Sequence, residues 1–288
     1  MPPTIVEVRD FLSCDYSKLF PVGSIFGFFA KPEIPIVSVI SYLLFSKVFF
    51  NNLRLLLRID PKGLVISRLT ALHNGLLALY SGWTFVCTAP LVVSYMLKYG
   101  FWGTLCDPKQ NLWLNYNFQF WLTHFYISKY YEFIDTWIVL VKGRTPIFLQ
   151  TFHHAGITIL MWGFVVTDNT IGLVIVCFNS FIHTLMYSYY FFATFGYQSP
   201  LKHYLTQAQI IQFLLGMSLT IPAHFISGCL TPAQSLVLGI TQVYTVILIA
   251  LFISFYINSY VTARRKKREK DVNGTHNSGG NGSGNKLD

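Results

Sequence analysis

The sequence predicts an all-α, polytopic membrane protein with about seven transmembrane helices. Apolar residues make up 53% of its 288 residues and charged residues only 11%, and long runs with almost no charge are typical of segments that cross a bilayer. Lysine and arginine gather in alternate loops between these runs, as the positive-inside rule requires. The net charge of +9 therefore indicates membrane topology and contact with anionic lipid, and we expect no nucleic-acid partner.

The apolar segments are matched to spans by length, because about 20 helical residues cross the hydrocarbon core of a bilayer. The second segment is much longer than one crossing needs, and Gly75, Gly82 and Pro90 can let it tilt, kink or divide into two elements. The expected spans are Ile34–Phe50, Leu64–Tyr99, Asn117–Val141, Pro146–Val166, Ile171–Thr194, Tyr204–Ile226 and Ala233–Val261.

The charged residues of the loops predict how the spans are oriented. Loops after the second, fourth and sixth spans hold only Lys98 and Lys109, then Asp168, then no charge between Ser227 and Pro232, so we expect them in the lumen. The other loops are basic and are expected in the cytosol. Their basic residues are Arg54, Arg58 and Lys62, then Lys142 and Arg144, then Lys202, and finally Arg264–Arg268.

This orientation divides the chain into a lumenal segment over 1–33, a membrane domain over 34–261 and a cytosolic tail over 262–288. No short apolar segment with a small-residue cleavage site opens the chain, so the first span is expected to direct insertion. The tail is rich in Gly, Asn and Ser and cannot bury apolar area, which predicts disorder. On the cytosolic side, its sequons at Asn273 and Asn281 are expected to stay unglycosylated.

The cysteines are scattered over spans and loops without CxxC spacing. The sequence therefore indicates neither a zinc site nor a disulfide framework. A cysteine nucleophile is also not expected, because Cys177 lies about 200° around its helix from the polar residue Asn179. The five cysteines are Cys14, Cys87, Cys106, Cys177 and Cys229.

The fourth span carries two adjacent histidines in the stretch TPIFLQTFHHAGITILM. Thr145 can cap a helix and Pro146 fits its first position, so we expect the helix to begin there. Two core histidines, each bonded to a neighbouring helix, are the ordinary interpretation. Polar groups inside a bilayer are costly and usually functional, which favours a site instead. At 3.6 residues per turn, one face holds Gln150, His153, His154, Ile157 and Met161.

Three further spans carry polar groups at helical spacing. An internal ion pair between Lys129 and Glu132 that only fixes helix packing would account for part of the third span. In the sixth span, interhelical hydrogen bonds alone would account for the polar residues of TQAQIIQ. The groups are Lys129, Glu132, Asp135 and Thr136 in KYYEFIDT, then Asn179, His183, Met186, Tyr187 and Tyr190 in NSFIHTLMYSYYF, and Thr206, Gln209 and Gln212 in TQAQIIQ.

These polar groups share one depth in the predicted topology. Counted from the cytosolic ends of their helices at about 1.5 Å per residue, they lie about 8 to 17 Å below that surface, with Lys129 and Asn179 slightly deeper. Four helices therefore place polar side chains in one layer of the cytosolic leaflet. The layer contains Glu132, Asp135, His153, His154, His183, Tyr187, Gln209 and Gln212.

Three classes of protein can use buried histidines in this way. A membrane di-iron oxidoreductase needs many histidines at HxxxH and HxxHH spacings, and this chain has a single cluster. A seven-helix transporter or receptor could use the charges as a proton or solute path, although no internal repeat is evident. In acyl transfer a neutral imidazole acts as nucleophile or base, while amides and hydroxyls stabilise an oxyanion. A CoA group at the cytosolic mouth and a fatty chain in an apolar tunnel suit the depth of the layer.

The motifs KYYEFIDT, QTFHH, NSFIHTLMYSYY and TQAQIIQ, in this order and on these spans, resemble the four signature motifs of the ELO family of very-long-chain fatty acid elongases. The resemblance covers about Ile34 to Val261 and implies a 3-oxoacyl-CoA synthase, a transferase that condenses acyl-CoA with malonyl-CoA. The family box usually reads HxxHH, whereas this chain has Gln150 at its first position. Gln-bearing boxes resemble those of many elongases of polyunsaturated fatty acids, and the substitution argues against a metal ligand at this position.

Carried over by position, the resemblance implies that His153 attacks the thioester and forms an acyl-imidazole. His154 and His183 would then stabilise or move charge. Lys129, Glu132 and Asp135 would shape the site or meet polar parts of CoA and malonyl groups. The residues expected to orient the imidazoles or the thioester are Asn179, Tyr187, Gln209 and Gln212, and Gln150 and Tyr190 are further expected substrate-binding residues.

The resemblance also implies a setting for the reaction. It places the protein in the endoplasmic reticulum membrane, with the N-terminus lumenal and the C-terminus cytosolic. No cofactor and no metal is expected beyond the two CoA substrates. The other enzymes of the elongation cycle, a ketoacyl-CoA reductase, a dehydratase and an enoyl-CoA reductase, are expected partners, and a homodimer stays open. The tunnel is expected to close on the lumenal side, near Trp162, Gly216 or Pro222.

Overall fold

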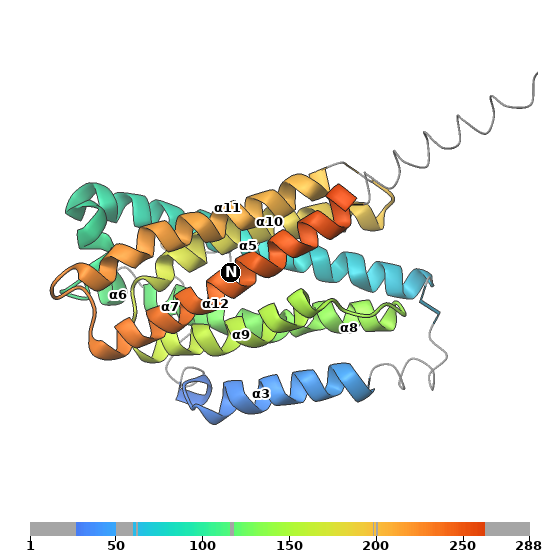
Figure 1. Ribbon diagram of the computed structural model, residues 1–288, viewed down its shortest axis with the longest axis horizontal. Coiled ribbons are helices and arrows are strands. Elements are labelled where there is room, and N and C mark those ends of the chain that lie inside the picture. Colours follow the sequence, from blue (N-terminus) through green and yellow to red (C-terminus); the bar gives the residue numbers. More distant parts are fainter. Residues whose placement is uncertain are drawn as a thin grey trace, which may run out of the picture.

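The computed structural model describes residues 27–49, 60–61, 63–115, 118–197, 199 and 201–262. Every regular element in these residues is a helix (Figure 1), which confirms the predicted all-α class. The predictions that fall outside the described residues concern 1–26, Arg54, Arg58, Lys62, Arg264–Arg268, and the tail with Asn273 and Asn281.

The helices follow the predicted spans closely. Within the part of the chain that the structure describes, four stretches are long and apolar enough to cross a membrane: Leu64–Cys106, Gly172–Thr194, Leu201–Phe225 and Pro232–Val261. The elements are α3 (Glu33–Leu44), η1 (Phe45–Phe49), α5 (Leu64–Cys106), α6 (Asn111–Asn115), α7 (Phe118–Tyr131), α8 (Phe133–Val141), α9 (Phe148–Val166), α10 (Gly172–Thr194), α11 (Leu201–Thr220), η2 (Ile221–Phe225), α12 (Pro232–Tyr256) and η3 (Ile257–Val261).

The other predicted spans, the first, third and fourth, form helices that are shorter or that carry the predicted polar residues. The third predicted span is divided at Glu132 into α7 and α8, and its charges lower its mean hydropathy. The polar side chains of Gln150, His153 and His154 do the same for α9. The stretches least typical of a membrane helix are therefore those that hold the predicted site.

Among the described residues, the helices form a closed ring with α3 outside it. Each of α5, α10, α11, α12, α9 and α7 packs on the next, and α7 returns to α5. α3 packs on α9 at the edge of the bundle (Figure 1). Next to this contact, the ring of Tyr42 in α3 stacks on that of Phe133 in α8, with centroids 4.2 Å apart.

Two glycines let α5 and α10 lie against each other along their length. A Cβ at Gly75 would stand 3.3 Å from the ring of Phe191, and one at Gly82 would stand 3.5 Å from Thr184. Small residues at such contacts allow membrane helices to approach closely. The break in α5 comes instead at Gly100, with φ 75° and ψ 171°, so the long second span is one helix followed by a short turned piece.

The predicted start of the fourth span is wrong by two residues. α9 begins at Phe148 after an extended Ile147, and its N-terminus has no side-chain cap, so neither Thr145 nor Pro146 starts it. The end of α8 explains the delay. Gly143 has φ 68°, and the amide of Arg144 bonds the Val139 carbonyl at 3.0 Å. The chain closes α8 with this turn before it reverses.

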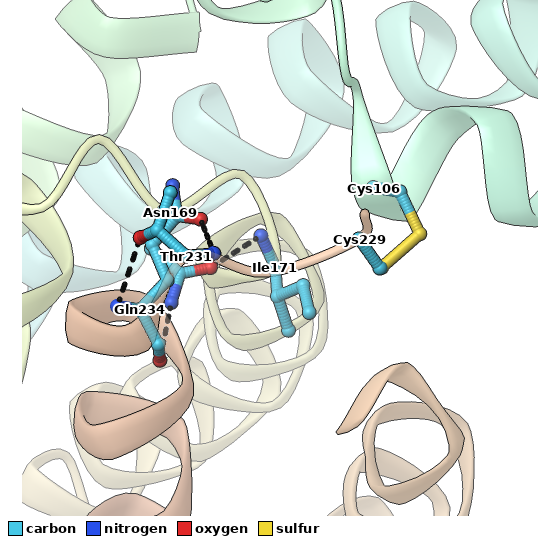
Figure 2. The surroundings of a disulfide bond; sticks show 6 residues. All are labelled: Cys106, Asn169, Ile171, Cys229, Thr231 and Gln234. Carbon is cyan, nitrogen blue, oxygen red and sulfur yellow. Dashed lines mark hydrogen bonds between the residues drawn. A yellow bond between two sulfur atoms is a disulfide. The ribbon is translucent and has the colours of Figure 1, made fainter. Parts of the chain in front are cut away.

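The expectation that no disulfide is present is also wrong. Cys106 and Cys229 form a disulfide across 123 residues of sequence (Figure 2). The two cysteines follow the predicted second and sixth spans, which the basic loops place on the same side. Their sequence spacing carries no signal, because the pairing depends on how the ends of α5 and η2 meet in the fold.

Side-chain hydrogen bonds secure the same end of the bundle. Gln234 donates to the carbonyls of Thr167 and Asp168 at 3.0 and 3.1 Å, and Asn169 donates to the Gln234 carbonyl at 3.2 Å (Figure 2). Thr231 and Gln234 form a capping box at the start of α12. We call this set, Cys106, Cys229, Asn169, Thr231 and Gln234, the disulfide end.

Candidate functional site

A buried ion pair lies between α7 and α10. Lys129 Nζ donates to Glu132 Oε1 at 2.6 Å and to Asn179 Oδ1 at 3.3 Å. Lys129 is 1% exposed and Glu132 is 2% exposed. Among the described residues, Glu132 Oε2 has no hydrogen-bond partner. Because burial of such a pair is only partly offset by its contacts, the pair is a weak stabiliser and marks a candidate site.

Asn179 connects this pair to His183. Its Oδ1 accepts from Lys129, so its Nδ2 donates to His183 Nε2 at 3.2 Å. The ring proton of His183 therefore lies on Nδ1, which stands 3.8 Å from Glu132 Oε1. The lone pair of Nε2 is already engaged, and His183 is poorly placed to attack a substrate.

Asp135 is the centre of a second set of polar contacts. Its Oδ1 accepts from His73 Nε2 at 2.8 Å, and its Oδ2 accepts from the Tyr187 hydroxyl at 2.7 Å. His154 Nε2 lies 3.8 Å from the same Oδ2. His73 Nδ1 in turn lies 3.3 Å from the Tyr131 hydroxyl. One carboxylate thus joins side chains from α5, α9 and α10.

His153 lies next to α12 and away from both carboxylates. The Tyr244 hydroxyl donates to the His153 carbonyl at 3.0 Å and lies 3.5 Å from Nδ1 of its ring. Gly156 allows this approach, because a Cβ there would overlap the Tyr244 ring. The rings of His153 and His154 have centroids 5.5 Å apart. The adjacent histidines therefore point to different surroundings, His154 to Asp135 and His153 to Tyr244.

A mostly apolar cavity lies between α9, α10, α11 and α12, and His153 is on its wall. Along α10 the lining extends from Asn179 to Ile171, and along α11 from Gln212 to Thr220. Each stretch is a separation of eight residues, or about 12 Å of helix. The amides of Asn179 and Gln212 lie at one end of these two stretches, and apolar side chains line most of the rest. α12 adds the polar side chains of Thr241, Gln242 and Thr245. The cavity can hold a hydrocarbon chain whose polar end lies at His153.

Most predicted site residues are brought together, and three are not. Gln209 donates to Met186 Sδ at 3.4 Å, Tyr190 is 40% exposed, and Gln150 is half-buried near the start of α9. None of these three lines the described cavity. The residues in the two polar sets or on the cavity wall are Lys129, Glu132, Asp135, His153, His154, Asn179, His183, Tyr187 and Gln212.

Sequence reasoning missed His73, Tyr131 and Tyr244. His73 is an isolated polar residue in an apolar span, which is a weak signal. Tyr131 lies within KYYEFIDT, but it does not share the three- or four-residue spacing that links the polar residues of that motif. Nothing in the sequence singles out Tyr244, because its approach to α9 at Gly156 is visible only in the folded chain. Cys177 contacts Thr88, with Sγ 3.6 Å from Oγ1, and does not line the described cavity.

Two observations concern ions. The described residues contain no group of three or more His, Cys, Asp and Glu side chains placed to hold a metal ion. Beyond the end of α8, Lys142 and Arg144 supply positive charge. Burial lowers the pKa of the Lys142 ammonium, and the adjacent Arg144 lowers it further. Such a cationic pair is suited to phosphate groups.

The sequence matches the family model described as ELO: GNS1/SUR4 family over residues 28–268. It is 33% identical over 165 residues to fatty acid elongase sre1 of Dictyostelium discoideum, which is 56% of this chain and 60% of that protein. Fatty acid elongase A of the same organism is 29% identical over 76% of this chain and 80% of its own. Fatty acid elongase 1 of Trypanosoma brucei brucei is 27% identical over 54% and 53%. Two of these matches therefore span less than two thirds of the relative.

Proposed function

The chain belongs to the ELO (GNS1/SUR4) family, and from this premise we propose that it is a fatty acid elongase acting as a 3-oxoacyl-CoA synthase. It condenses a long-chain acyl-CoA with malonyl-CoA and releases CO2 and CoA. The observation that carries the proposal is the position of His153, on the wall of an apolar cavity and next to His154, whose own ring faces Asp135. The names of its relatives, all fatty acid elongases, support the same reaction class.

In the first stage, His153 is the nucleophile. With the ring proton on Nδ1 facing the Tyr244 oxygen at 3.5 Å, Nε2 keeps its lone pair. Nε2 attacks the thioester carbonyl, the C–S bond breaks, and the CoA thiolate takes the proton that the imidazole loses. The product is an acyl-imidazole, and a neutral amide such as Gln212 on the cavity wall can stabilise the oxyanion.

In the second stage, malonyl-CoA loses CO2 and its enolate carbon attacks the acyl carbon. The C–N bond to His153 then breaks. Lys129 and the nearby imidazole of His183 favour negative charge on this side of the cavity. His154 lies next to His153 and moves charge between it and Asp135.

The acyl chain occupies the cavity beyond His153. Of the three residues expected near its closed end, Gly216 is part of the lining. Trp162 donates instead to the carbonyl of Ala30 at 2.8 Å, and Pro222 lies in η2 after the last lining residue of α11. Gln150 remains a weak indication of polyunsaturated substrates.

The CoA groups enter from the cytosol, where Lys142 and Arg144 can meet their phosphates. The disulfide between Cys106 and Cys229 supports a lumenal position for the opposite end, because disulfides persist in oxidising compartments. We accordingly propose an endoplasmic reticulum protein with a lumenal N-terminus and a cytosolic C-terminus. Its product would pass to the ketoacyl-CoA reductase, dehydratase and enoyl-CoA reductase of the cycle.

The test is malonyl-CoA-dependent lengthening by the full chain in microsomes or nanodiscs. Saturated, monounsaturated and polyunsaturated acyl-CoAs are compared, and CO2 and 3-oxoacyl-CoA are measured. We expect stoichiometric CO2 and 3-oxoacyl-CoA that persist after stringent metal removal. Activity lost on metal removal and restored by iron would favour the di-iron alternative, and solute flux without CoA release would favour a transporter.

A further inference from the structure

The proposed condensation consumes one proton, and the proposed mechanism does not yet supply it. In the second stage the malonyl C–C bond breaks and CO2 leaves. A new C–C bond forms to the acyl carbon, and the C–N bond to His153 breaks. The ring nitrogen keeps the electron pair of that bond and must gain a proton to become neutral imidazole again. The imidazole next to it, His154, is 6% exposed, so a proton that reaches His153 by way of this neighbour has to come through the protein.

We propose that Tyr131, His73 and Asp135 form a proton relay that supplies this proton to the histidine pair. The inference rests on the proposed function and adds residues that the acyl-transfer site does not itself require. Tyr131 O lies 3.3 Å from His73 Nδ1, and His73 Nε2 lies 2.8 Å from Asp135 Oδ1. Asp135 Oδ2 lies 3.8 Å from His154 Nε2. The atoms form one line from the edge of α7 to the imidazole beside His153.

The assignment of protons along this line is consistent. A nitrogen 2.8 Å from a carboxylate is the donor, so His73 carries its proton on Nε2 and its Nδ1 accepts from the Tyr131 hydroxyl. His73 gives the Nε2 proton to Asp135 and takes the hydroxyl proton on Nδ1. The Tyr187 hydrogen bond to Oδ2 breaks, and rotation of the Asp135 carboxyl presents the new proton to Nε2 of His154. His154 then gives the proton on its other ring nitrogen to His153, whose ring centroid is 5.5 Å from its own. Water is the acid that restores the Tyr131 hydroxyl.

The entrance of the relay is a groove between α5 and α8. Its lining extends from Ile66 and Val141, at the ends of these helices, to Leu76 and Tyr131. Tyr131 is 39% exposed, whereas His73 behind it is 5% exposed. Both residues line the groove, and Tyr131 is the more exposed of the two, which is the position that the first member of a relay requires.

The groups around Asp135 favour this route over the other polar set. His73 from α5, Tyr131 from α7, His154 from α9 and Tyr187 from α10 are the titratable groups nearest Asp135. Tyr42 from α3, Lys129 from α7 and Tyr190 from α10 also interact with it electrostatically. Tyr187 donates to Asp135 and holds the carboxylate in place until it receives the proton. Lys129 directs its ammonium group to Glu132 and Asn179, and neither Lys129 nor Glu132 lines the groove.

The experiment separates the two stages in full-length protein. Acyl-CoA alone measures CoA release in the first stage, and later addition of malonyl-CoA measures loss of the bound acyl group in the second. The test variant is His73→Gln, whose amide can still donate to Asp135 but cannot relay a proton. His124→Gln is the matched control, because His124 is a half-buried histidine bonded to Tyr80 at 3.1 Å and outside the relay.

We expect His73→Gln to keep the first-stage rate within about two-fold and to slow the second stage at least about 100-fold, the usual contribution of general acid–base catalysis. Tyr131→Phe should slow the same stage and lower its solvent deuterium isotope effect. Retention of the wild-type second stage by His73→Gln overturns the relay, and equal loss in both stages assigns His73 a structural role only.

Failure of the proposed function has a different signature. If wild-type protein turns over but releases no CoA from acyl-CoA alone, the acyl-imidazole is wrong, while the overall reaction still consumes a proton. The relay is then judged from steady-state turnover. His73→Gln must fall well below His124→Gln and lose the solvent isotope effect, and equal turnover of the two variants overturns the inference.

Discussion

The disulfide end and the polar sets around Glu132 and Asp135 use polar groups in opposite ways. At the disulfide end, Gln234 and Asn169 satisfy backbone carbonyls, and Cys106 and Cys229 are joined covalently. Around the histidines, charged groups are buried with contacts left open, such as Glu132 Oε2 and His154 Nδ1 among the described atoms. One region is organised for stability and the other keeps buried groups available for chemistry.

The largest expected effect is on activity alone. His153→Ala removes the proposed nucleophile and should lower condensation by at least about 10³-fold, while the protein still inserts and its thermal midpoint changes little. Gln207→Ala is the control, because Gln207 donates to Tyr256 and does not line the cavity. Normal turnover by His153→Ala would remove the nucleophile assignment.

Breaking the ion pair should affect both stability and activity. Lys129→Met leaves Glu132 buried without its counter-charge, which costs about 3–5 kcal/mol and disturbs His183 through Asn179. The double variant with Glu132→Gln should recover much of the stability but not the activity. Denaturation in detergent, followed with turnover, checks both, and full activity of the double variant would show that the pair only stabilises packing.

At the disulfide end the effect should fall on stability alone. Cys106→Ser opens a loop of 123 residues, and loss of such a link costs about 2–5 kcal/mol. Turnover per folded molecule should be unchanged. Cys177→Ser is the matched control, since Cys177 has no disulfide. A variant that stays stable but loses turnover would contradict the division between the two regions.

The smallest effect concerns Asp168, between α9 and α10. Burial raises the pKa of its carboxyl, so the folded state binds this proton more tightly than the unfolded state. Stability therefore falls as pH rises from the unfolded pKa, near 3.9, through the raised folded pKa. Asp168→Asn should raise the free energy of unfolding by less than about 0.5 kcal/mol at neutral pH and should not change it at low pH. The substitution itself should cause no backbone strain, because φ is 50° here and Asn tolerates that conformation. Thermal midpoints across pH check the sign.

Sequence reasoning predicted one of these regions far better than the other. Lys129, Glu132, Asp135, His153 and His183 stand out because polar residues are rare in membrane helices, and helical spacing sets their faces. The disulfide gave no such signal, because its cysteines are 123 residues apart and meet only in the folded chain. His73 was missed for the same reason, since its role depends on a partner 62 residues away.

Helix boundaries were predicted where local chemistry decides them. The capping box at Thr231 agrees with the predicted start of the last span within one residue. α9 was predicted to begin at Pro146 and begins at Phe148, because the chain leaves the turn at the end of α8 and is still extended at Ile147. Gln150 and Tyr190 matched the motifs but do not line the cavity, so motif membership alone did not place their side chains.

The most direct test of the account is the covalent state of His153 after incubation of the full chain with acyl-CoA and no malonyl-CoA. Peptide mass spectrometry should find the acyl group on His153, released on addition of malonyl-CoA as 3-oxoacyl-CoA. No adduct under conditions of normal turnover, or an adduct on His154 or His183 instead, would contradict the assignment of His153 as the nucleophile at the cavity wall.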